Sequence, residues 1–245
     1  MKKEPYIWAH RGASAYAPEN TLPAFELAAS MGADGVELDI QMTKDKQLVV
    51  CHDPRLERVS NGHGWVKDYT LDQLKALDFS GGKKDFEGVQ IPTLAEVYDL
   101  LQDTGLTVNV ELKKDVPFSG MEKALLELTR EKGYEDRVIY SSFNHLSLEL
   151  IRVMNKQARI GYLLLKTIPN LVDSVQKLKV NALHIPYADL KKPGLLEKCQ
   201  KAGIALNVWT VNTNDQARGC AELGINAMIT DYPDKARQWL AKTTD

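Results

Sequence analysis

The stretch from Glu37 to His52 reads Glu-Leu-Asp-Ile-Gln-Met-Thr-Lys-Asp-Lys-Gln-Leu-Val-Val-Cys-His. Side chains two apart on a strand point to the same face, so Glu37 and Asp39 share one face. The polar tetrad Thr-Lys-Asp-Lys is too short for a parallel crossover, which needs about a dozen residues, so we expect an antiparallel return. With the turn centred near Asp45 and Lys46, residue 39 lies opposite residue 52. The stretch therefore predicts a β-hairpin that brings two acids and an imidazole within about one cross-strand spacing.

Apolar segments of strand length alternate with segments of helical period along the rest of the chain. The expected strands are 6–9, 35–42, 107–112, 138–143, 160–164, 182–185, 205–211 and 227–230, with 48–51 as the hairpin return. The expected helices are 22–31, 94–102, 120–132, 146–155, 168–178, 192–202, 213–223 and 235–241.

Eight strand–helix alternations indicate a parallel sheet that is covered on its outer side. Eight such units close most simply into a (β/α)₈ TIM barrel, here distorted by the hairpin. A doubly wound open sheet is the alternative. The first strand–helix turn, Arg-Gly-Ala-Ser-Ala-Tyr-Ala, lacks the G-x-G-x-x-G pattern and so disfavours a dinucleotide-binding form of that fold.

Local start and stop signals agree with these boundaries. Thr93 and Glu96 form a capping-box pattern, and Thr21 is placed to cap the first helix. Glycines fall where helices should end, at Gly32, Gly105, Gly133, Gly203 and Gly224.

The length of 245 residues suits one large barrel domain over 1–245. The segment at about 54–91 stands where a single helix should follow, yet it is rich in turn residues. We interpret it as a small insertion on the rim of the barrel. A hydrophobic content of 44% and a charged content of 26% are ordinary for a globular protein.

Charge and cysteine content exclude several classes of protein. A net charge of −2 gives no general attraction to nucleic acid or to anionic membranes. Three widely spaced cysteines do not form a disulfide framework. No apolar stretch approaches 18 residues and the first residues lack a signal-peptide pattern, so we expect no membrane span and a cytoplasmic location.

Candidate functional residues fall near the ends of expected strands, where the working residues of a barrel belong. His10 and Arg11 end the first strand, and Glu37 and Asp39 lie on the second. Further along, Glu111 and Lys113 share a face at the end of another strand, and Trp209 lies near the end of the strand at 205–211. We expect these side chains to gather at one end of the barrel.

Three carboxylates that converge in a closed site would repel one another by several kcal/mol. A divalent cation relieves that repulsion, and ligation by oxygen alone favours Mg²⁺ or Ca²⁺ over zinc. With Arg11 and Lys113 included, three acids and one such ion leave a net charge of about +1. The sequence therefore predicts one divalent cation on Glu37, Asp39 and Glu111, and an anionic substrate such as a phosphodiester.

The two histidines suit proton transfer at such a substrate. Imidazole titrates near neutral pH, so one ring takes a proton while the other gives one. Cleavage of a phosphodiester needs a base at the nucleophile and an acid at the leaving alkoxide. His10 and His52 supply that pair, while Arg11 stabilises charge on the phosphoryl oxygens. Trp209 is either a core residue or a stacking surface for substrate.

Several motifs closely resemble the glycerophosphodiester phosphodiesterase family over nearly the whole chain. They are His10-Arg11-Gly12-Ala13-Ser14, Pro18-Glu19-Asn20-Thr21, Glu37-Leu38-Asp39, Thr43-Lys44-Asp45, His52-Asp53, Ile91-Pro92-Thr93-Leu94, Val110-Glu111-Leu112-Lys113 and Trp209-Thr210-Val211-Asn212. The chain also resembles, more distantly, phosphatidylinositol-specific phospholipases C.

The resemblance implies hydrolysis of glycerophosphodiesters to an alcohol and sn-glycerol 3-phosphate. It implies that His10 is the general base, His52 the general acid, and Arg11 and Lys113 the phosphate contacts. It also implies a small-molecule substrate and a cyclic phosphate formed by attack of the glycerol 2-hydroxyl. One departure concerns the insertion. Members of the family often carry an aromatic pair soon after its Leu-Asp, whereas here Leu77-Asp78 leads into Phe79-Ser80-Gly81-Gly82. The preferred head group of the substrate therefore stays open.

Two alternatives stay open beside this interpretation. A phospholipase C-like or lysophospholipase D-like enzyme would act on lipids, and it predicts an exposed apolar rim on the insertion. A non-catalytic barrel would bind glycerophosphate without turnover, and it predicts that an acid or a histidine is missing. The oligomeric state and the physiological ion are also open.

Overall fold

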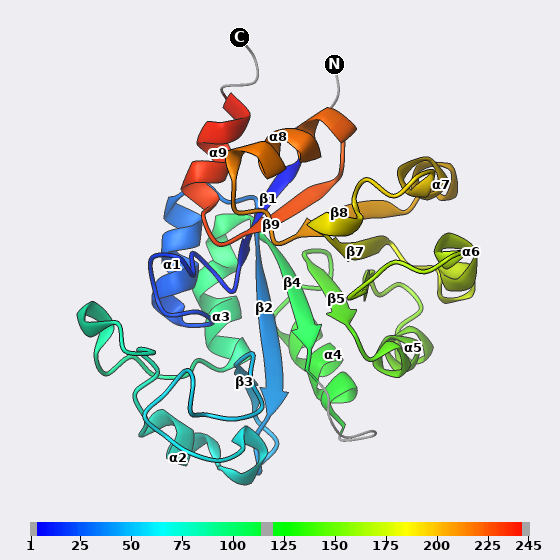
Figure 1. Cartoon of the computed structure of the whole chain (residues 1–245). Coiled ribbons are helices and arrows are strands. Elements are labelled where there is room, and N and C mark those ends of the chain that lie inside the picture. Colours follow the sequence, from blue (N-terminus) through cyan, green and yellow to red (C-terminus); the bar gives the residue numbers. More distant parts are fainter. Residues whose placement is uncertain (1–3, 114–119, 242–245) are drawn as a thin grey trace.

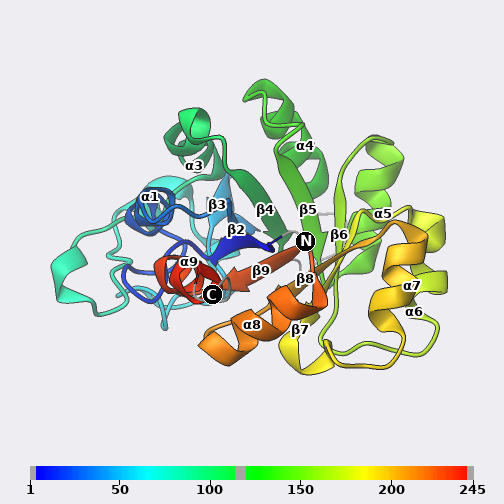
Figure 2. The ribbon, with the colours of Figure 1, turned by 90° about the horizontal axis from the view of Figure 1, so that it is seen from above.

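The computed structural model of the protein describes residues 4–113 and 120–241. Within these residues, eight parallel strands form a closed barrel because the first strand pairs with both the second and the last. Helices surround the strands when the molecule is viewed from above (Figure 2). The strands are β1 (Tyr6–His10), β2 (Gly35–Met42), β3 (Leu48–Val50), β4 (Thr107–Leu112), β5 (Val138–Ser142), β6 (Ile160–Leu163), β7 (Ala182–Pro186), β8 (Ala205–Trp209) and β9 (Ala227–Thr230). The predicted distorted TIM barrel is confirmed, and the open doubly wound sheet is wrong.

The hairpin return β3 is the one strand of the described sheet that runs antiparallel to its neighbour. Its register differs by one residue from the prediction. Ile40 pairs with Val50, and the Cys51 amide donates to the Asp39 carbonyl, so Cys51 rather than His52 lies opposite residue 39. The cause is a five-residue turn centred on Asp45, closed by the Thr43 amide on the Gln47 carbonyl.

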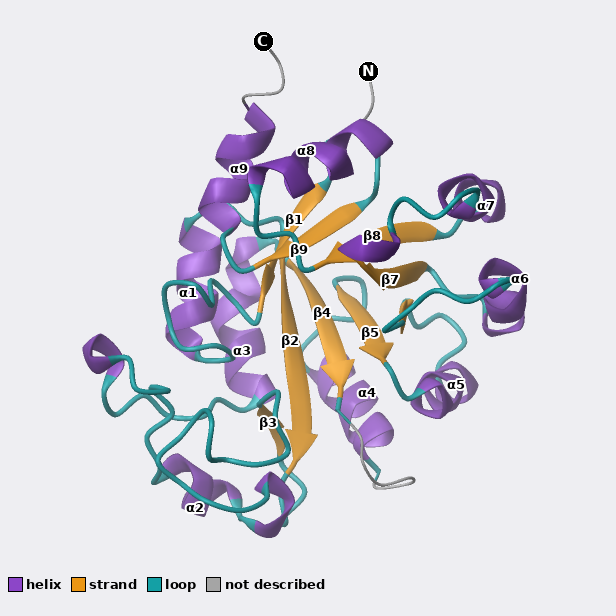
Figure 3. Cartoon of the chain, in the orientation of Figure 1, coloured by secondary structure: helices purple, strands orange, loops and turns teal. Residues whose placement is uncertain are grey.

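The expected helices form close to their predicted bounds and cover the outside of the barrel (Figures 1 and 3). The capping box of Thr93 and Glu96 is confirmed. Thr21 occupies the N-cap position of α1, but its hydroxyl donates to the Pro18 carbonyl, so the predicted side-chain cap is wrong. The helices are α1 (Leu22–Ser30), α2 (Leu71–Lys75), α3 (Leu94–Leu101), α4 (Met121–Glu131), α5 (His145–Met154), α6 (Leu171–Val175), α7 (Leu195–Ala202), α8 (Asn214–Leu223) and α9 (Pro233–Ala241).

The apolar core lies between the strands and these helices, because outward-facing strand residues pack on the helices. Inward positions of β2 are polar, whereas its outward positions Val36, Leu38 and Ile40 are fully buried in the core. This alternation leaves the acids of β2 to face the barrel interior. None of the described helices is long and apolar enough to cross a membrane.

The segment 54–91 lies beside the C-terminal end of β2 and holds a small core of its own (Figure 1). Leu56, Leu74 and Phe79 are buried in this core, which packs on Val49 of the hairpin return. Lys83 ties the segment to the loop after β1 by donating to two backbone carbonyls of that loop. The insertion therefore stands against the rim where the candidate site lies.

Candidate active site

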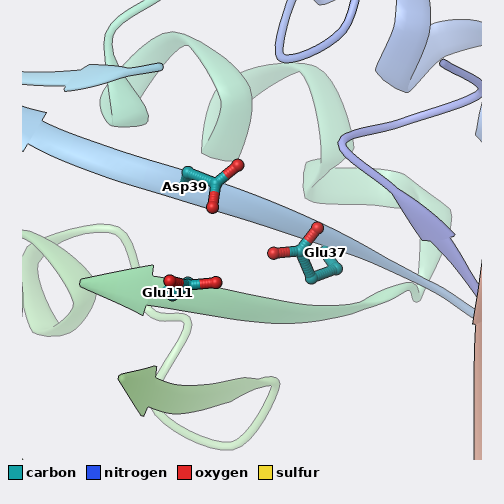
Figure 4. Close-up of side chains that lie close together, drawn as sticks. All are labelled: Glu37, Asp39 and Glu111. Atoms are coloured by element: carbon teal, nitrogen blue, oxygen red, sulfur yellow. The ribbon is translucent and has the colours of Figure 1, made fainter. Parts of the chain in front are cut away.

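Three acidic side chains meet on the neighbouring strands β2 and β4 (Figure 4). Parallel pairing sets Asp39 beside Glu111. Glu37 lies two residues before Asp39 and therefore on the same face of β2. Each of the three is at most 6% exposed, and one oxygen atom of each lies within 4.8 Å of the others. The structure thus brings together the three acids that the sequence singled out.

Burial governs how these acids ionise. Burial and the charge of Asp39 raise the pKa of Glu37 to about 7 and that of Glu111 to about 8. Burial would also raise the pKa of Asp39, but Lys113 and Arg11 outweigh it and lower the pKa to about 2. Asn20 adds a hydrogen bond of 2.8 Å to Asp39. The cluster therefore holds one stable carboxylate and two acids that resist ionisation.

Two cations border the acids. The Lys113 ammonium lies 2.5 Å from Glu111 Oε1 and 3.1 Å from Asp39 Oδ1. Arg11 Nε lies 3.4 Å from Asp39 Oδ2, and its Nη1 donates to Glu19 at 2.9 Å. Both side chains line the same cavity as Glu37 and Glu111. They are placed to contact an anion that enters beside the acidic cluster.

The donor set fits a hard divalent cation. Three carboxylates from two rigid strands supply oxygen ligands only, which Mg²⁺ and Ca²⁺ prefer. Two positive charges on that spot would offset the burial and the charge of Asp39 that raise the pKa values of Glu37 and Glu111. Glu37, Asp39 and Glu111 are therefore suited to hold one such ion.

His10 ends β1 with its ring held from behind. Its Nδ1 lies 2.7 Å from Asp231 Oδ1, and its Nε2 lies 4.0 Å from Glu37 Oε2. Asp231 is itself fixed by the Asn212 amide and the Ser14 hydroxyl. Burial lowers the pKa of His10, but the hydrogen bond with Asp231 and the charge of Glu37 raise it overall. The Asp231 contact leaves Nε2 as the nitrogen that faces Glu37.

His52 follows the hairpin return and has a similar anchor. Its Nδ1 lies 2.6 Å from Asp53 Oδ1, and the Gln41 side chain donates to its carbonyl. Burial lowers the pKa of His52, and this effect together with Lys113 and Arg11 outweighs the opposing charge of Asp39. Although the predicted register is wrong, the chain bends after Cys51 and the imidazole still reaches the cavity.

A cavity of about 180 Å³ unites these groups. Its polar part holds both imidazoles, two of the acids and both cations, whereas Phe143, Leu163 and Trp209 form an apolar wall. The Trp209 ring meets Phe143 edge-on at 6.0 Å, and its Nε1 has no hydrogen-bond partner among the described residues. Trp209 is therefore a wall of the cavity as well as part of the packing inside the barrel.

Comparisons with known proteins agree with this geometry. The sequence model described as the glycerophosphoryl diester phosphodiesterase family matches residues 10–235. The chain belongs to this family. A glycerophosphodiester phosphodiesterase of Caldanaerobacter subterraneus subsp. tengcongensis is 41% identical over 93% of this chain and 94% of its own length.

Solved structures of the family have the same fold. A phosphodiesterase of Oleispira antarctica, in complex with the product sn-glycerol-3-phosphate, superposes with a TM-score of 0.90 at 29% identity and covers 97% of each chain. A glycerophosphodiester phosphodiesterase of Thermotoga maritima gives a TM-score of 0.81 at 31% identity over 97% of this chain and 99% of its own. The predicted family, and with it an enzyme of the phosphoric diester hydrolase class, is confirmed.

The sequence motifs left several residues of the site without a role. Asp231 lies 221 positions from His10, so no local spacing links them, although His10 ends β1 and Asp231 follows β9, its parallel neighbour in the barrel. Asp53 enters the sequence motifs only as the neighbour of His52. Arg58 was not singled out, yet it forms ion pairs with Asp53 and Glu19.

The Asp231–His10 contact gives a testable expectation. Asp231 accepts a hydrogen bond from His10 Nδ1 and so keeps the proton of the neutral ring on that nitrogen. Asparagine at position 231 no longer fixes this tautomer, so we expect kcat of Asp231→Asn to fall by about a hundredfold or more. The pKa of His10 should also fall, because Asp231 is the main group that raises it. A pH–rate profile checks this, since the acidic limb should move to lower pH. An unmoved acidic limb at unchanged kcat would contradict the role of Asp231.

Proposed function

We propose that the protein hydrolyses glycerophosphodiesters to sn-glycerol 3-phosphate and a free alcohol. The observation that carries this proposal is one cavity that contains two carboxylate-anchored imidazoles, two cations and the edge of an acidic cluster suited to a divalent ion. Membership of the phosphodiesterase family supports it. Mg²⁺ or Ca²⁺ on Glu37, Asp39 and Glu111 would polarise a phosphoryl oxygen and offset charge in the transition state.

Each of these side chains has its own role in the proposed reaction. Arg11 and Lys113 bind the phosphoryl oxygens and orient the diester. His10 takes the proton of the glycerol 2-hydroxyl, whose oxygen attacks phosphorus and forms a cyclic phosphate. As the bond from phosphorus to the alcohol breaks, His52 gives that alcohol its proton. Water then opens the cyclic phosphate, with the proton transfers reversed.

The pKa directions bear on which histidine is the base. With the acids alone, His10 has the raised pKa and His52 the lowered one, which would favour the opposite assignment. Glu37 is one of the groups that raise the pKa of His10. A divalent cation at Glu37 would cancel that charge and favour neutral His10, which the role of base requires.

Lipid substrates have less support. Large apolar side chains of the insertion such as Leu56 and Phe79 are buried in its own core, and Trp65 is 37% exposed, so the insertion presents little of the apolar rim that a phospholipase needs. Leu165 is an exposed apolar side chain at the cavity, 76% exposed, but it lies outside the insertion. The proposed substrates are therefore small deacylated diesters such as glycerophosphocholine and glycerophosphoethanolamine. The single-domain organisation and cytoplasmic location stay predictions.

A coupled assay for sn-glycerol 3-phosphate tests the proposal. We expect sn-glycerol 3-phosphate from at least one deacylated glycerophosphodiester in the presence of Mg²⁺ or Ca²⁺. A lysophospholipid keeps its acyl chain and cannot yield that product, so its turnover is followed by the choline or phosphocholine that it releases, and we expect much less of either. Faster turnover of the lysophospholipid would favour the lipid alternative. Tight binding of glycerophosphate without turnover of any diester would favour a non-catalytic barrel.

A further inference from the structure

Arg58 of the insertion uses three of its nitrogen atoms on two carboxylates. Its Nε donates to Asp53 Oδ2 at 2.5 Å, and its Nη1 and Nη2 donate to the two oxygens of Glu19 at 2.7 and 2.8 Å. Glu19 lies in the loop after β1, 39 positions earlier in the chain. The planar guanidinium therefore spans two segments that nothing local in the sequence would join.

Each carboxylate also holds a residue of the cavity. Asp53 accepts from His52 Nδ1 through the oxygen that Arg58 does not contact. Glu19 Oε1 accepts from Arg11 Nη1 at 2.9 Å as well as from Arg58. A continuous chain of charged hydrogen bonds thus runs from His52 through Arg58 to Arg11.

We propose that Arg58 is a positioning residue through which the insertion orients His52 and Arg11 together. The proposal rests on the proposed function, because it assigns His52 to proton transfer and Arg11 to phosphate binding. The insertion would then contribute to catalysis and not only shape the entrance of the cavity. The contact of Arg58 with Asp53 orients the imidazole of His52, and its contact with Glu19 orients the guanidinium of Arg11.

The exposure of Arg58 separates this role from a role in stability. Its side chain is 48% exposed, and ion pairs at that exposure contribute little to the free energy of unfolding. Orientation of reacting groups is much more sensitive, because a displacement of about 1 Å costs up to a hundredfold in rate. Loss of Arg58 should therefore change the kinetics far more than the unfolding midpoint.

The experiment compares Arg58→Gln with Arg55→Gln in the metal-loaded enzyme. Arg55 is a matched control, since it is 54% exposed in the same segment and pairs only with Glu57 among the charged partners described. We expect Arg58→Gln to lower kcat and raise KM, with kcat/KM falling between about tenfold and a hundredfold. Arg55→Gln should leave both constants unchanged.

Single variants should distinguish the effects of these two contacts. Asp53→Asn should mainly lower kcat, and Glu19→Gln should mainly raise KM. Adding Arg58→Gln to Asp53→Asn should lower kcat no further, because the contact between residues 53 and 58 is already lost. Arg58→Lys keeps the charge but loses the fork that reaches both carboxylates, so it should restore only part of the activity.

A readout independent of turnover keeps the proposal separate from the proposed function. The ¹⁵N signals of the His52 ring, assigned by their loss in His52→Ala, should shift in Arg58→Gln and stay in place in Arg55→Gln. Unmoved signals together with wild-type kinetics in Arg58→Gln would overturn the positioning role. If wild type lacked phosphodiesterase activity but the signals shifted, the proposed function would fail and the contact chain would stand. If Arg58→Gln did not fold, additive effects of Arg58→Lys and Asp53→Asn on kcat would overturn the proposal.

Discussion

Alanine at position 10 or 52 is expected to lower kcat by about 10²–10⁴-fold, the range typical of one acid or base catalyst. Each ring is held at its own place through Nδ1, His10 by Asp231 and His52 by Asp53. When one ring is removed, the other therefore does not take over its role. Steady-state rates with glycerophosphocholine measure the effect. KM should change less than kcat, because neither ring is the main contact for the phosphate charge.

A second substrate distinguishes the base from the acid. From a glycerophosphodiester with a p-nitrophenyl group, p-nitrophenolate leaves without a proton from the enzyme. His52→Ala should therefore recover most of its rate of p-nitrophenolate release, whereas opening of the cyclic phosphate still needs His52. His10→Ala should stay slow on both substrates, because the nucleophile still needs its base. Recovery in His10→Ala and not in His52→Ala would reverse the two roles.

Without a divalent cation, the protein is expected to lose stability as the pH rises from about 5 to 8. Glu37 and Glu111 have pKa values of about 7 and 8 in the folded protein, above those of an unfolded chain. The folded state thus binds more protons than the unfolded state over this range, and the free energy of unfolding falls with rising pH. The loss reaches about 1.4 kcal/mol per pH unit for each group that stays protonated.

A bound cation should reverse that trend. Mg²⁺ or Ca²⁺ binds the ionised acids, and an ion at a hundred times its Kd adds about 2.7 kcal/mol to the free energy of unfolding. Urea unfolding at pH 5, 7 and 8 with chelator and with each ion measures both effects, and chelator should also abolish turnover. Glu111→Gln should flatten the pH dependence and weaken the response to the ion.

The exposed Glu149 supplies the control for this experiment. Glu149→Gln should follow wild type at every pH, since this exposed side chain on α5 is not part of the acidic cluster. A wild-type stability that rises from pH 5 to 8 with chelator, together with activity that is indifferent to chelation, would contradict a metal site on the three acids.

Much of the fold follows from local patterns in the sequence. β2 and β4 match the predicted ranges because the strands are long and their inward and outward positions differ clearly in polarity. Register is harder to predict, because a turn one residue longer moves every pair across the hairpin. Cys51 therefore took the place predicted for His52 opposite residue 39.

Residues of the site that lie on well-delimited strands could be predicted from the sequence. Residues that contact a histidine or an arginine of the site from a distant segment could not. Glu37 and Glu111 share an inward face on strands that the sequence delimits well, so their convergence could be expected. The partner of His10 is Asp231, from the other end of the chain, which only closure of the barrel brings near. The insertion has no repeating pattern, so nothing in its sequence indicates that Arg58 reaches Glu19.

The most direct test of the central claim is a ³¹P NMR time course of glycerophosphocholine with the metal-loaded enzyme. The account predicts that the diester signal gives way to sn-glycerol 3-phosphate in wild type and persists in His10→Ala and His52→Ala. Release of phosphocholine in place of glycerol 3-phosphate, or turnover at the wild-type rate by either variant, would contradict it.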